Sequence, residues 1–291
     1  MADESRRQLI DAYAPDEMAR RVLDLGVAKT RLTASNTIAL AVLAGAFIGI
    51  GAAFATLAMT DTGLGLGPAR VLGGVTFSLG LILVVVAGAE LFTGNNLVAM
   101  AWASRFITTG ALLRNWVLVF MGNLIGALIT GGLVFWSGTW SAGESDVAMT
   151  AMRIAATKAQ LGFGEAFARG ILCNALVCLA VWLSQSGRST TDKILAIIWP
   201  ITAFVALGFE HSIANMYFIP LGMLLRSDAG LAAEAAAAGI PVEVLSTAGF
   251  ISNLVPVTLG NIVGGTLLVA SIYWFVYLRA GTVGAGEEGA R

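Results

Sequence analysis

Charged residues are scarce in this sequence, and their scarcity excludes an ordinary soluble domain. Only 12% of the 291 residues are charged and 57% are hydrophobic, whereas soluble domains are about a quarter charged and about half apolar. The net charge is −1 and no stretch gathers lysine and arginine into a basic patch, so nucleic acid is not an expected partner. The composition predicts an integral membrane protein whose surroundings are a lipid bilayer.

Cysteine and histidine are almost absent, which removes several classes of chemistry. Cys173 and Cys178 fall within one apolar run, so we expect free thiols and no disulfide framework. The single histidine, His211, has no metal-ligating cluster and no serine-base arrangement beside it, so neither an enzyme nor a cofactor is predicted. The polar first 35 residues contain no apolar segment followed by a cleavage site, so no removable signal peptide is expected.

Long apolar runs are abundant, and several reach the roughly 18–20 residues that cross a bilayer. Four runs are uninterrupted, whereas two exceed 30 residues and carry polar residues near their middle. A broken helix, which enters the membrane and restarts at an angle, explains both the extra length and the interruption. We expect uninterrupted spans at about 37–60, 113–137, 166–184 and 248–278, and interrupted ones at 71–104 and 194–225.

The two interruptions belong to an internal repeat. One alignment pairs GAELFTGNN (88–96) with GFEHSIANM (208–216), and a second pairs NWVLVFMGNLIG (115–126) with NLVPVTLGNIVG (253–264). Chance matching of glycines is the alternative, but Glu and Asn are rare in apolar segments. Because each unit has three spans, the second must be inverted. The predicted fold is all-α, with six transmembrane helices in an aquaporin-like inverted repeat of three plus three, the second and fifth being broken.

The distribution of positive charge orients these spans. Twelve lysines and arginines fall on the side of both termini and five on the other, so both termini are predicted to face the cytoplasm, across the cytoplasmic (inner) membrane. Residues 15–32 suggest a short interfacial helix, although a frayed polar lead-in also fits. The predicted organisation is a cytoplasmic segment 1–35, one transmembrane domain 36–279 with repeats 36–137 and 163–279, and a cytoplasmic tail 280–291.

The interruptions hold side chains suited to an anion. The N-terminus of a half-helix presents unpaired N–H groups and a partial positive charge, which favour an anion at the midplane. His211 can donate a hydrogen bond or a proton to that anion, and Thr93, in the matching interruption, offers a hydroxyl. A structural histidine and a threonine bonded to its own helix remain the alternatives.

Carboxylates and amides accompany these two residues. Glu90 and Glu210 would repel an anion, so we expect them to brace the interruptions by accepting hydrogen bonds from backbone N–H groups of the partner interruption, with proton relay as the alternative. Asn174 and Asn215 are expected to brace His211 or the substrate, or else to make simple interhelical hydrogen bonds.

Other residues near the interruptions suggest a gated pathway. Large apolar side chains above and below a polar pocket can form constrictions that exclude hydrated ions, and ordinary core packing is the alternative. The candidates are Phe77, Leu81, Leu91, Phe92 and Phe204. Lys158, on the outward loop before the fourth span, would attract anions to a pore mouth or would be an ordinary solvated loop charge.

These stretches resemble the formate/nitrite transporter family. The resemblance rests on GAELFTGNN, RGILCNALVCLAVW (169–182), GFEHSIANMYFIPLGM (208–223) and LVPVTLGNIVGG (254–265), and it runs from about Thr33 to Arg279. It implies a homopentamer with one pore in each subunit that passes small monovalent anions such as formate, nitrite, hydrosulfide or lactate. In this resemblance the family's central histidine falls on His211, its partner threonine on Thr93, its pore-mouth lysine on Lys158 and its bracing asparagine on Asn174.

Within this family resemblance, formate is the expected substrate. The stretches GRSTTDKILAIIWP (187–200) and YFIPLGMLLR (217–226) look more like formate members than nitrite members. Because a bare charge is costly at an apolar constriction, we expect the anion to take up a proton and cross as the neutral acid. A neutral-solute pore of the water or glycerol kind is less favoured, since the sequence has no Asn-Pro-Ala turns.

Overall fold

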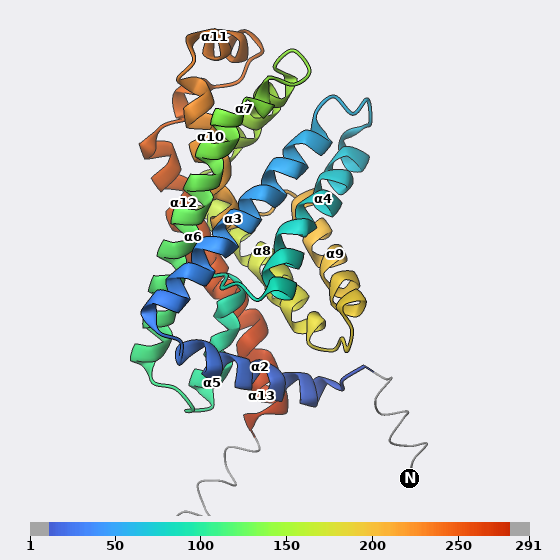
Figure 1. Ribbon diagram of the computed structural model, residues 1–291, viewed down its shortest axis with the longest axis vertical. Coiled ribbons are helices and arrows are strands. Elements are labelled where there is room, and N and C mark those ends of the chain that lie inside the picture. The colour runs from blue at the N-terminus through green and yellow to red at the C-terminus, as the bar shows by residue number, and fades with distance from the viewer. Residues whose placement is uncertain (1–11, 280–291) are drawn as a thin grey trace, which may run out of the picture.

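The computed structural model describes residues 12–279, and all regular structure in this part of the chain is helical. Five helical stretches are long and apolar enough to cross a membrane, and they run side by side along the molecule (Figure 1). Large apolar side chains such as Leu57, Leu133 and Leu267 are exposed on them, as expected where lipid is the solvent. The five stretches are α3 (Ala34–Met59), α4 (Leu66–Ala87), α6 (Thr109–Ser137), α8 (Phe163–Ser184) and Thr247–Tyr277. The protein is therefore a multi-pass membrane protein.

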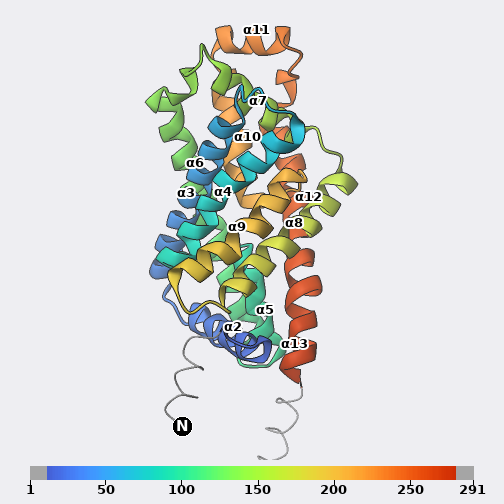
Figure 2. The ribbon, with the colours of Figure 1, turned by 90° about the vertical axis from the view of Figure 1, so that its right-hand side faces the viewer.

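Shorter helices cover the two ends of this bundle. At one end α2 lies across the bundle beside α5 and α13, and at the opposite end α7 and α11 project (Figures 1 and 2). The described chain begins and ends on the side of α2. The bounds are α2 (Pro15–Thr30), α5 (Ala99–Ala103), α7 (Asp146–Ala159), α11 (Ala229–Ala237), α12 (Thr247–Val263) and α13 (Ser271–Tyr277), with short turns η2 (Thr139–Ser141) and η3 (Val242–Val244).

Two helices end inside the bundle, each at a polar interruption. The first, α4, ends at Ala87, and regular structure resumes at η1 (Gly94–Val98) and α5. The second, α9 (Thr190–Ala206), is followed by α10 (Ser212–Arg226). The chain leaves these helices through Gly88 (φ 80°) and Gly208 (φ 71°), a left-handed conformation that glycine adopts without strain.

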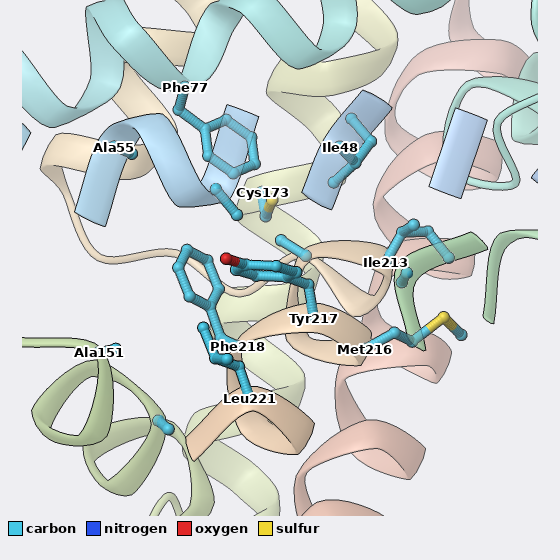
Figure 3. Close-up of a cluster of buried hydrophobic side chains, with 14 of the residues drawn as sticks. Ile48, Ala55, Phe77, Ala151, Cys173, Ile213, Met216, Tyr217, Phe218 and Leu221 are labelled. Carbon is cyan, nitrogen blue, oxygen red and sulfur yellow. The ribbon is translucent and has the colours of Figure 1, made fainter. Parts of the chain in front are cut away.

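An apolar core fixes α10 against the surrounding helices. Figure 3 shows Phe77 of α4 gathered with Tyr217 and Phe218 of α10 around α3, which contributes Ile48. All four side chains are buried. Tyr217 and Phe218 lie early in α10, so this packing fixes the part of α10 that follows the second interruption.

Glycine allows two helix pairs to pack with backbones almost in contact. A Cβ atom added to Gly126 of α6 would collide with the carbonyl oxygen of Val42 in α3, and one added to Gly260 of α12 would collide with that of Phe167 in α8. Small residues at such crossings are typical of membrane helices. The α3–α6 and α8–α12 pairs are the same part of the two repeat units.

A Gly126→Ala substitution is expected to destabilise the fold. Because its neighbour is backbone, the helices must separate, at a cost of about 3 kcal/mol in unfolding free energy. The matched control is Gly132→Ala on the same helix, where an added Cβ has no atom within 4 Å. Thermal unfolding of the solubilised protein measures both. Equal melting temperatures for the two variants would contradict the close-packing account.

The predicted span 248–278 contains a change of helix type, after Gly260, that the sequence did not indicate. The predicted span 248–278 is helical throughout, but its hydrogen bonds change to the wider π pattern over Gly264–Ala270. A Cβ added to Gly265 would lie 2.5 Å from Asn174 Nδ2 and 2.7 Å from Asn96 Cβ. The widened segment therefore brings bare backbone against two buried amides, as π segments near functional sites often do.

Candidate functional site

His211 and Thr93 meet where the two interruptions face each other. His211 stands directly before α10 and caps it, since its Nδ1 accepts a hydrogen bond from the N–H of Ala214 at 3.1 Å. Its Nε2 lies 2.8 Å from Thr93 Oγ1. Both residues are buried, at 2% and 0% exposure. The two residues that the sequence singled out are thus in direct contact.

The cap decides how this pair shares its protons. Because Nδ1 accepts the Ala214 N–H, the neutral ring carries its proton on Nε2 and donates it to Thr93 Oγ1. The threonine hydroxyl then keeps its own proton free to donate to a third group. The pair therefore offers one hydrogen-bond donor to whatever reaches it.

Two cavities approach this pair from opposite ends of the bundle. The first, of about 390 Å³, is lined by His211 together with Asp61 and Leu66 near the α3–α4 connection. The second, of about 370 Å³, is lined by residues of α2 and its end, among them Leu25 and Leu32. We call them the outer and inner cavity, after the ends that the positive charges predict to be outside and inside.

Most of the predicted constriction residues border these cavities. Phe77 and Phe204 line the outer cavity, and their rings meet edge to face with centroids 5.5 Å apart. Leu81 and Leu91 line the inner cavity. Phe92 differs: it lines neither, because its ring packs against Trp116 and Phe120 of α6.

Each glutamate of the repeat is bound by a lysine and by at least one asparagine. Lys158 Nζ lies 2.9 Å from Glu210 Oε1, and Asn215 Nδ2 donates to Oε2 at 2.6 Å. Asn253 contacts both Asn215 and Glu210. The expected backbone N–H donors are not the ones used, since within the described chain these carboxylate oxygens accept from side chains. Asn215 consequently braces Glu210 and not His211.

The same cluster recurs in the first repeat unit. Lys29 Nζ lies 2.7 Å from Glu90 Oε1, Asn95 Nδ2 donates to Glu90 Oε2 at 2.6 Å, and Asn95 also donates to Asn115. Both glutamates are nearly fully buried. Because a buried carboxylate is costly unless it is paired, each lysine is required where it stands. Lys158 lies in the last turn of α7, and not on the loop that the sequence suggested.

The sequence as a whole matches one known family. The profile described as "Formate/nitrite transporter" matches residues 16–275. The chain belongs to the formate/nitrite transporter family. Among curated relatives, "Formate channel FocA" of Escherichia coli (strain K12) is 44% identical over 273 residues, covering 92% of this chain and 96% of its own length. "Probable formate transporter" of Methanothermobacter thermautotrophicus is 38% identical over 283 residues, covering 91% and 97%.

Solved structures agree with this assignment to the formate/nitrite transporter family. One described as "Pentameric formate channel with formate bound" superposes with a TM-score of 0.75 at 39% identity, covering 84% of this chain and 98% of its own. Another, described as "FNT family ion channel", superposes with a TM-score of 0.77 at 29% identity, covering 89% of this chain and 98% of its own. These similarities establish the transport family and the helical membrane fold.

Asn174 of this transporter braces Thr93 and not His211. Its Nδ2 lies 3.2 Å from the carbonyl oxygen of Thr93, 2.7 Å from Asn96 Oδ1 and 2.7 Å from the carbonyl oxygen of Asn261. Cys178 Sγ also donates to the Thr93 carbonyl. The amide therefore ties the first interruption to α8 and α12, which fixes the threonine opposite the histidine.

Two further asparagines hold the interrupted backbone, although sequence reasoning gave them no role. Asn123 accepts from the N–H of Phe92 and donates to the carbonyl of Glu90. Asn261 accepts from Ser212 and donates to Glu210 in the same way. Irregular backbone inside a membrane needs such partners. The signal was present, since these asparagines occupy matching positions of the 115–126 and 253–264 stretches.

Lys29 was missed as well, because α2 lies outside every apolar run. Lys29 of α2 pairs with Glu90 of the first repeat unit, and Lys158 of α7 pairs in the same way with Glu210 of the second. With these helices included, the two structural units begin before residues 36 and 163. Only a short sequence match connects the two lysines: Lys29 lies three residues before Leu32, and Lys158 lies three residues before Leu161. Within the described chain, no group of three His, Cys, Asp or Glu side chains is placed to hold a metal.

Proposed function

We propose that this transporter is a membrane channel for small monovalent anions of weak acids, with formate as its substrate. The observation that carries the proposal is the buried His211–Thr93 hydrogen bond between two cavities. The name of the 44% identical Escherichia coli relative, a formate channel, favours formate. Nitrite, hydrosulfide or lactate would use the same pore, and a neutral-solute channel is the remaining rival.

The membrane arrangement follows from the same reasoning. We infer six crossings in an inverted three-plus-three plan, in which α4 with η1–α5 and α9 with α10 are the broken second and fifth spans. The repeated lysine–glutamate–asparagine clusters support the inversion. The related structure described as a pentameric formate channel supports a homopentamer. Both termini face the cytoplasm across the inner membrane, although residues 1–11 and 280–291 lie outside the described chain.

Passage through this channel requires the anion to lose its charge for a short distance. Formate approaching from the outer cavity meets Phe77 and Phe204, where a bare charge is costly. It therefore crosses as formic acid after taking up a proton, and the Thr93 hydroxyl, oriented by His211, donates a hydrogen bond to it. Lys158 keeps attracting anions although it is paired, because its ammonium has three donors and lines the cavity.

Flux of labelled formate into liposomes containing the purified protein tests this proposal. Uptake should exceed that of empty liposomes and should be faster at lower external pH, where more formic acid is present. Nitrite, hydrosulfide and lactate should compete in a graded series. Swelling in glycerol, with no formate uptake above empty liposomes, would replace the anion channel by the neutral-solute rival.

Widening the aromatic constriction is expected to change selectivity. A Phe77→Ala/Phe204→Ala variant removes the two rings of the outer cavity that meet edge to face, and it should raise lactate flux relative to formate flux by about tenfold. Phe92→Ala is the control, because it removes a phenylalanine ring that lines neither cavity. An equal change in both variants, measured as the ratio of labelled lactate to labelled formate uptake, would remove the constriction from the account.

A further inference from the structure

The outer and inner cavities differ sharply in charge, although the repeat relates them. The outer cavity is lined by four cationic side chains, which are Arg70, Arg153, Lys158 and Arg169, against the two carboxylates of Asp61 and Glu210. The described lining of the inner cavity has one lysine and one glutamate, which neutralise each other. The anion pathway therefore has an excess of positive charge at the outer mouth and none at the described inner one.

Positions related by the repeat show that Arg169 and Arg153 have no cationic counterpart in the first repeat unit. The carbonyl of Arg169 accepts from the N–H of Glu210 as the carbonyl of Leu40 accepts from that of Glu90, so leucine occupies the related inner position. Asp24 stands five residues before Lys29 just as Arg153 stands five before Lys158. The first repeat unit has an apolar and an acidic side chain at these two positions, so the repeated scaffold does not itself call for arginine there.

The guanidinium groups gather at the outer interruption. The Nη1 atoms of Arg70 and Arg169 lie 3.7 Å and 3.8 Å from the point where a Cβ of Gly208 would stand. Arg169 is held there by the carbonyl of Gly208 and by Glu165. Among the described residues, the guanidinium groups of Arg70 and Arg153 have no hydrogen-bond or ion-pair partner, so their donors are available to a ligand.

We propose that Arg70, Arg153 and Arg169 form an outer oxyanion site at this mouth, which multivalent oxyanions occupy and thereby obstruct the channel from the outer side. Guanidinium groups bind carboxylates through paired N–H donors, and several of them in one cavity favour an anion of more than one charge. The 390 Å³ cavity admits a tricarboxylate, whereas the apolar constriction beneath it does not pass one. Formate binds there weakly and is concentrated before it crosses.

Citrate binding to the purified, solubilised protein tests the site by isothermal titration calorimetry at low ionic strength. Arg70→Gln/Arg153→Gln should raise the Kd for citrate at least tenfold. Arg169→Leu, which introduces the residue found at the repeat-related position 40, should weaken citrate binding as well. The control is Arg31→Gln, which removes the same charge from a residue lining neither cavity, and its Kd should stay within twofold of wild type. Absence of citrate binding to the wild type, or equal Kd values in all variants, would overturn the proposal.

Formate flux separates this site from the proposed function on which its blocking role rests. External citrate should slow formate uptake into liposomes by wild type several-fold more than by Arg70→Gln/Arg153→Gln, and high salt should abolish the difference. Citrate binding lost in the variants, but with no formate flux by wild type, would leave the site standing and reject the formate channel. Normal formate flux with the same citrate sensitivity in wild type and variant would reject the site alone.

Discussion

Formate flux through a His211→Asn variant is expected to fall by up to about tenfold below wild type, because a hydrogen bond between neutral groups contributes about 0.5–1.5 kcal/mol. Asparagine is among the best helix N-caps, so it can still accept from Ala214 and start α10. Its shorter side chain cannot reach the position of Nε2, 2.8 Å from Thr93 Oγ1. Labelled formate uptake into liposomes over a pH series measures the loss.

Two companions make this result specific. Thr93→Val keeps the shape of the side chain without its hydroxyl, and it should lower flux by a similar factor. The double variant should be little worse than either single one, because both remove the same hydrogen bond. The melting temperature of His211→Asn should stay near that of wild type. Unchanged flux and unchanged pH dependence in both single variants would show that the pair has no part in transport.

Lys158→Met is expected to lower the unfolding free energy by about 3–5 kcal/mol, the usual effect of leaving one member of a buried ion pair alone. Glu210 is 2% exposed, and its carboxylate is bound by Lys158 at 2.9 Å. Without the lysine, the carboxylate stays buried with no cation beside it. Thermal or denaturant unfolding of the solubilised protein measures the change.

The matched control is Lys158→Met/Glu210→Gln, which removes both charges together. Glutamine can still accept from Asn215 through its carbonyl oxygen, so most of the lost stability should return. The Lys29→Met and Lys29→Met/Glu90→Gln pair should behave likewise in the first repeat. Equal destabilisation in the single and double variants would mean that Lys158 acts through packing, against Phe218 for example, and not through its charge.

The fold was readable from the sequence where one physical signal dominates. Apolar length predicted spans at 37–60, 113–137 and 166–184, and the structure has helices over Ala34–Met59, Thr109–Ser137 and Phe163–Ser184. A polar residue inside such a run is costly, which is why His211 and Glu210 stood out. The repeat placed Thr93 in the interruption that matches that of His211, and the partnership of the two was what the family resemblance implied.

Other parts of the site were beyond the sequence for identifiable reasons. Lys29 lies in a short polar helix and pairs with a residue 61 positions away, so no local pattern connects them. The direction of Phe92 depends on irregular backbone after α4, where helical periodicity no longer applies. The donors to Glu210 could not be chosen between backbone and side chains without coordinates.

We propose that two interrupted helices bring His211 and Thr93 together at a buried point on the path of a small acid. An experimental density map of the protein in a bilayer mimetic with saturating formate tests it most directly. We expect α9 and α10 separated at residues 207–211, the imidazole beside Thr93, and anion density next to this pair, on the path between the outer and inner cavities. A continuous helix there, or an imidazole packed away from any passage with formate bound elsewhere, would contradict it.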